Sequence, residues 1–71
     1  MKSYKLEILV KTNNENIKYE SKIMNGEEFE SYSSIIKNKI KDLEIITIID
    51  VNANVIFINP EKIISIRIVI D

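Results

Sequence analysis

The chain has 71 residues, carries 10 basic against 11 acidic side chains, and contains neither Cys nor His. This length predicts one small domain, residues 1–71, near the lower limit at which a packed core is stable. Without thiols or imidazoles the usual ligands of zinc and haem are missing, so we expect no metal and no cofactor. The near-neutral charge argues against a general attraction to nucleic acid or to an anionic membrane.

Residues 4–11 and 16–23 predict a β-hairpin with one face in water. Apolar and charged side chains alternate in both segments, which is the period of a half-buried strand. Residues 12–15 contain two Asn and favour a turn between them. The apolar face collects the following side chains: Tyr4, Leu6, Ile8, Val10, Ile17, Tyr19 and Ile23.

The period then changes to that of an amphipathic helix over residues 26–41. Asn25 is a favourable N-cap, and Glu28 stands where its carboxylate can return a hydrogen bond to the cap. Acids at the start and bases at the end suit the helix dipole. One apolar stripe is expected to face the core: Phe29, Tyr32, Ile36 and Ile40.

Residues 43–50, 55–58 and 63–70 predict three more strands. Residues 51–54 turn the chain once, and Asn59-Pro60 fits a type I turn. The order ββαβββ predicts an α+β fold, a five-stranded antiparallel sheet with one helix packed on one face. Unlike the first hairpin, the last three strands are apolar on both faces, a pattern typical of strands buried on both sides.

The second apolar face of these strands has no cover within the chain, because the single helix is needed on the other face. A large exposed apolar patch usually marks an interface. We therefore expect a homo-oligomer or a protein partner, most simply a two-fold dimer with sheet packed on sheet. Edge-to-edge pairing through residues 63–70 is the other route, because no Pro protects that strand; a sheet that curls into a small barrel is the alternative. The residues expected at the interface are Ile46, Ile48, Val55, Phe57, Ile63, Ile66, Arg67 and Val69.

Arg67 is the only Arg and lies in the middle of a very apolar strand. One interpretation is a clamp for an anion or a carboxylate at the interface. The favoured interpretation is a charge that protects an edge strand from aggregation.

The sequence favours neither catalysis nor membrane insertion. No His is present to activate a Ser, and the acids Glu27 and Glu30 fit the solvated first turn of a helix better than a catalytic pair. Gly26 is the only Gly, which excludes a Gly-rich phosphate loop. The N-terminus lacks the pattern of a signal peptide, and no apolar run is long enough to span a membrane. We expect a cytoplasmic protein that is not an enzyme.

The resulting hypothesis is a small binding protein that self-assembles through its C-terminal strands. Its richness in Ile, Lys and Asn is frequent among phage and mobile-element genes of AT-rich bacteria, which suggests an inhibitor or sequestering protein with a small-molecule pocket between subunits. The alternative is a nucleic-acid-binding protein. That protein would bind anions through the outer face of the first hairpin, at Lys5, Lys11, Lys18 and Lys22. Glu7 and Glu20 among these lysines favour an ordinary solvated sheet with cross-strand pairs instead.

Overall fold

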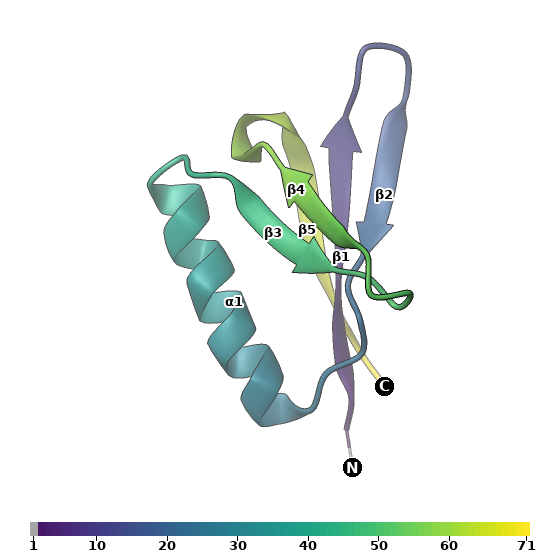
Figure 1. The fold of residues 1–71 in the computed structure, drawn as a ribbon, viewed down its shortest axis with the longest axis vertical. Helices are drawn as coiled ribbons and strands as arrows, with labels where there is room; N and C mark the ends of the chain where they lie inside the picture. Colours follow the sequence, from purple (N-terminus) through teal and green to yellow (C-terminus); the bar gives the residue numbers. More distant parts are fainter. Residues whose placement is uncertain (1) are drawn as a thin grey trace.

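A computed structural model describes residues 2–71 (Figure 1). The chain forms seven elements in this order: β1 (Tyr4–Lys11), β2 (Asn16–Glu20), α1 (Gly26–Lys41), β3 (Ile46–Ile49), β4 (Val55–Ile58), the 3₁₀ turn η1 (Pro60–Lys62) and β5 (Ile63–Ile70). The predicted ββαβββ order, the α+β class and the bounds of the helix are confirmed. The second and third strands are shorter than predicted. Within residues 2–71, no helix is both long and apolar enough to cross a membrane.

The strands form two antiparallel sheets, so the predicted single five-stranded sheet is wrong. One sheet has the order β2-β1-β5, and β3 pairs only with β4. Ser3 and Asp71 lie side by side because β5 returns to pair with β1 (Figure 1). The physical reason is that one helix is too narrow to cover the apolar face of a five-stranded sheet. A separate hairpin packed across β1 buries apolar side chains that a single sheet would leave in water.

The core lies where β1, the β3–β4 hairpin and α1 meet. Its buried members come from all three: Leu6, Ile8, Val10, Ile36, Ile46, Ile48 and Ile58. Phe29, Tyr32 and Ile40 of the predicted helix stripe pack against this cluster, which confirms that stripe. The Tyr32 hydroxyl also donates to the Thr47 carbonyl at 2.7 Å, which ties α1 to β3.

The two ends of α1 have different chemistry. Asn25 Oδ1 accepts the Glu28 N–H at 2.8 Å, as the cap pattern predicts. At the other end the Leu43 N–H bonds to Ile40 O and the Glu44 N–H to Lys39 O, the pair of bonds of a Schellman motif. Leu43 occupies the left-handed position of that motif with φ 55°, where Gly is usual. The helix therefore ends on a strained residue.

The turn between β3 and β4 is organised by one carboxylate. Asp50 Oδ1 accepts the N–H groups of Asn52 and Asn54, both at 2.9 Å. These donors, Asn54 foremost, hold the pKa of Asp50 below its usual value. Ala53 completes the turn with φ 64°. The predicted turns at 51–54 and at Asn59-Pro60 are both confirmed.

Candidate functional site

Strand β5 is an edge strand with one open side. Its other side pairs with β1 in the register Tyr4↔Ile70, Leu6↔Ile68 and Ile8↔Ile66. A register shift interrupts this pairing near residue 64, so residues 65–71 form the regular part. Among residues 2–71 no strand pairs with the second side of β5.

The backbone groups of alternate β5 residues point toward this open side. Ser3 and Asp71 exchange two backbone hydrogen bonds, of 3.1 and 2.9 Å, so they form a hydrogen-bonded antiparallel pair. Because such pairs alternate along a ladder, the odd-numbered residues of β5 bond to β1 and the even-numbered ones do not. Tyr4 agrees with this parity, since it bonds to Met24 on the far side of β1. The N–H and C=O groups of the even-numbered residues from 66 to 70 therefore face the open edge.

The side chains of the same residues are also uncovered. Ile66, Ile68 and Ile70 lie on the core side of the sheet, opposite the β1 residues that α1 and the hairpin cover. They nevertheless remain 36%, 52% and 57% exposed, because α1 and the β3–β4 hairpin cover β1 but do not extend over β5. We call these three residues, with the half-exposed Ile64, the β5 edge. Strand β5 thus carries both unpaired backbone N–H and C=O groups and exposed isoleucine side chains.

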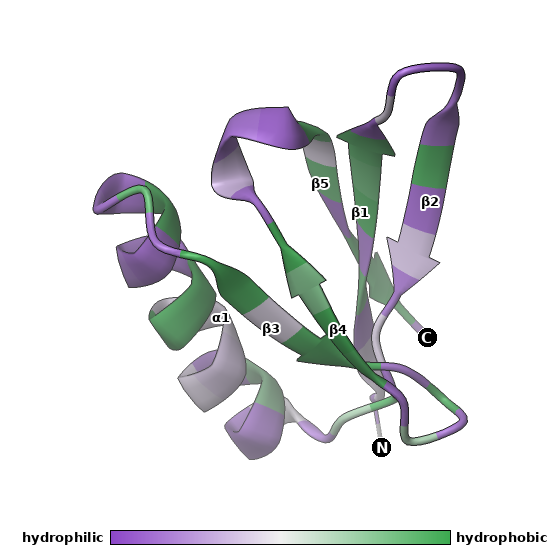
Figure 2. Cartoon of the chain, turned by 45° about the horizontal axis from the view of Figure 1, so that its top comes forward, coloured by the Kyte–Doolittle hydropathy of each residue, from purple (hydrophilic) through white to green (hydrophobic). Residues whose placement is uncertain are grey.

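A second apolar surface lies on the outside of the β3–β4 hairpin, which is hydrophobic along nearly all of both strands (Figure 2). Pairing places Thr47 opposite Phe57 and Ile49 opposite Val55 on this face. Phe57 is 72% exposed there. A groove of about 300 Å³ between β3 and α1 is lined in part by Ile35, Ile45, Ile49 and Tyr32. We call Ile49, Val55 and Phe57 the hairpin face.

The eight residues predicted for the interface separate into four pairs. Ile46 and Ile48 are fully buried in the core of the same chain and offer no surface. Ile63 and Val69 are half-buried. Val55 and Phe57 belong to the hairpin face, and Ile66 and Arg67 to β5.

Arg67 points to the opposite side of the sheet from the isoleucines. Its guanidinium lies 2.8 Å from the Glu7 carboxylate, which is almost buried, whereas the Arg67 side chain is 73% exposed. An anion bound at Arg67 would therefore compete with a carboxylate of its own chain. Lys5 Nζ approaches Glu20 at 2.9 Å and Glu7 at 4.0 Å, so the four side chains form one network across three strands. The Lys5–Glu20 hydrogen bond raises the pKa of Lys5 and lowers that of Glu20.

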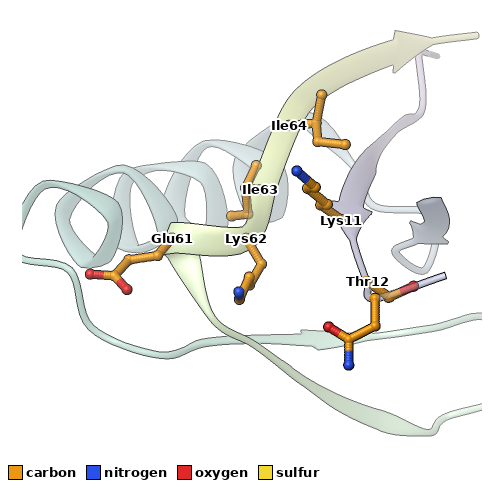
Figure 3. Close-up of a pocket in the computed structure, with 7 residues that line it drawn as sticks. Lys11, Thr12, Glu61, Lys62, Ile63 and Ile64 are labelled. Atoms are coloured by element: carbon orange, nitrogen blue, oxygen red, sulfur yellow. The ribbon is translucent and has the colours of Figure 1, made fainter. Parts of the chain in front are cut away.

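The predicted lysine surface is divided. Lys5 is held in the network above, and Lys22 pairs with Glu28 at 2.8 Å. Lys11 instead borders an open hollow of about 430 Å³ together with Lys62, whose place there nothing in the sequence signals (Figure 3). Lys18 borders a separate hollow beside Arg67. The four lysines therefore do not form one continuous patch.

Comparison with known proteins gave no matching family model, curated protein or solved structure. Within residues 2–71, no group of three or more acidic side chains is arranged to hold a metal ion.

Proposed function

We propose that this protein is a small non-catalytic interaction module that self-assembles through its C-terminal strands. The observation that carries the proposal is the β5 edge, where three alternate core-side isoleucines, Ile66, Ile68 and Ile70, are left about half in water. Soluble monomers seldom leave such a continuous apolar strip uncovered. A domain of this size has a small free energy of unfolding, so leaving apolar side chains in water would destabilise it appreciably.

The total surface supports the same conclusion. The chain exposes 5244 Å², whereas a monomeric protein of 8.3 kDa is expected to expose about 4,600 Å². If each of two copies buried this excess, the contact would cover about 1,300 Å² in total, which lies in the size class of specific interfaces. A homodimer is therefore the simplest assembly that accounts for the extra area.

The more specific role expected from the composition requires this assembly. A phage or mobile-element inhibitor with a ligand pocket between its subunits can form that pocket only once two subunits meet. We keep this role as a prediction that depends on the dimer.

One observation favours a second candidate, contact with nucleic acid. Lys11 and Lys62 approach the same hollow from β1 and η1, while the Glu61 carboxylate is directed away from Lys11 (Figure 3). Two neighbouring ammonium groups can bind a phosphate of a nucleic acid backbone. Against this, Lys5 and Lys22 already have carboxylate partners, which leaves few of the predicted lysines to neutralise a nucleic acid backbone.

The test is the molar mass in solution by light scattering over a range of micromolar concentrations. We expect twice the chain mass of 8.3 kDa, unchanged when salt is raised. A mass of one chain at every concentration would contradict self-assembly. Fluorescence anisotropy with labelled single- and double-stranded DNA at low salt tests the second candidate, and salt-sensitive binding there would favour it over the first.

A further inference from the structure

We infer that two copies join edge to edge through antiparallel β5 strands, so that two three-stranded sheets become one continuous six-stranded sheet. This inference rests on the proposed self-assembly and specifies how it happens. The partner is a second copy of the chain.

The backbone of β5 is complementary to itself. Its even-numbered residues from 66 to 70 present both N–H and C=O groups to the open side, as shown by the Ser3–Asp71 pair. A two-fold axis brings the even residues of one strand against the even residues of the other, so each outward group meets a partner. This contact satisfies groups that otherwise remain unpaired within the chain.

The side chains agree with the same contact. On the core side, edge pairing places isoleucines of one copy beside isoleucines of the other, and such β-branched cross-strand pairs are favourable. The isoleucine strip then continues across the junction, and each copy covers part of the other. On the outer side the only charge in the strand, Arg67, is already paired with Glu7 and need not be desolvated alone.

Arg67 also restricts the register. If Arg67 lay on the two-fold axis, it would face Arg67 of the partner subunit in a non-hydrogen-bonded pair, the type of antiparallel pair in which side chains lie closer together. Two like charges directly opposite each other are unfavourable. The regular part of β5, residues 65–71, has its midpoint at Ile68. With Ile68 on the axis, Ile66 pairs with Ile70 of the partner subunit, and Arg67 lies opposite Val69 of the partner subunit. We therefore place Ile68 on the axis.

The sharpest test changes one outward N–H. Proline at an edge position whose N–H faces solvent leaves the internal ladder intact, so Ile68→Pro removes a contact to the partner but none to β1. We expect Ile68→Pro to have the mass of one chain and a circular dichroism spectrum like the parent. Its matched control, Ile68→Thr, keeps the N–H and a β-branched side chain and should remain dimeric. A folded Ile68→Pro variant that is still dimeric would overturn edge pairing.

A cross-linking test does not depend on tolerance of proline. Because the chain has no Cys, a single introduced thiol reports one position. Two copies of Ile68→Cys on the axis lie at the Cα separation of about 5.5 Å that suits a disulfide, so mild oxidation should give a covalent dimer. Lys18→Cys on β2, at the far edge of the sheet, should not cross-link.

The outcomes separate the two proposals. A dimeric parent in which Phe57→Cys cross-links and Ile68→Cys does not would place the contact on the hairpin face, which overturns edge pairing but keeps self-assembly. A parent with the mass of one chain at all concentrations overturns both.

Discussion

At the scale of single residues, two positions carry backbone strain that the sequence does not reveal. Leu43 and Ala53 both have left-handed φ angles, although neither is Gly or Asn. Propensity and periodicity correctly predict the helix end and the turn. They cannot predict that these residues accept strain, because the conformation is imposed by the hydrogen bonds that close each motif.

Leu43→Gly should therefore stabilise the fold. Gly removes the Cβ that disfavours φ 55°, and the expected gain is about 1 kcal/mol in the free energy of unfolding. Urea denaturation measures it. Leu43→Ala is the control, because it shortens the side chain but keeps the Cβ and should give no such gain. An equal effect of both variants would show that strain at this residue is not the cause.

Protonation of Asp50 should weaken the fold in acid. Its pKa is lowered in the folded state, so the folded chain binds fewer protons than the unfolded chain as the pH falls below the usual carboxyl range. Its contribution to stability is thus present at neutral pH and is lost as the pH drops through the folded pKa. Melting temperatures from pH 7 to pH 2 should fall less for Asp50→Asn than for the parent. Glu15→Gln, in the exposed turn between β1 and β2 and outside the ion pairs found within residues 2–71, is the control and should keep the parental slope.

At the scale of elements, β1, β2 and α1 could be predicted, whereas the arrangement of the last three strands, β3, β4 and β5, could not. In β1 and α1 one face is polar, so periodicity alone identifies the inward residues. In β3 and β5 both faces are apolar, and the pattern is the same whichever face is buried. The pairing of β5 with β1, and not with β4, is a long-range contact that no local pattern records. Because residues 43–50 are apolar on both faces, the sequence predicts Ile46 and Ile48 at an interface, whereas they lie in the core.

The two faces of the β3–β4 hairpin should respond differently to truncation. Ile48 is fully buried, and Ile48→Ala should cost about 2–5 kcal/mol through lost packing and a cavity. Phe57 on the other face is mostly exposed, and Phe57→Ala should change the free energy of unfolding by less than about 0.5 kcal/mol. Urea titrations of both variants and the parent at one protein concentration measure these free energies of unfolding. A large loss for Phe57→Ala would mean that the hairpin face is covered in solution.

At the scale of the whole molecule, the sequence correctly indicates that apolar surface exceeds what one helix can cover. The first hairpin has a polar outer face, held by the Arg67–Glu7 and Lys5–Glu20 pairs. The isoleucines of β5 face the core side of the sheet, but α1 and the β3–β4 hairpin do not cover them. What the sequence could not provide is the position of the open edge, since this depends on which strand ends the sheet.

Amide hydrogen exchange at Ile68, followed as a function of protein concentration, tests this account most directly. The Arg67 N–H bonds to β1 and should be protected at every concentration, whereas the Ile68 N–H faces the open edge and can be protected only by a second copy. We predict that protection of Ile68 rises with concentration in step with the dimer mass. Fast exchange at Ile68 in a sample shown to be dimeric would contradict pairing through β5.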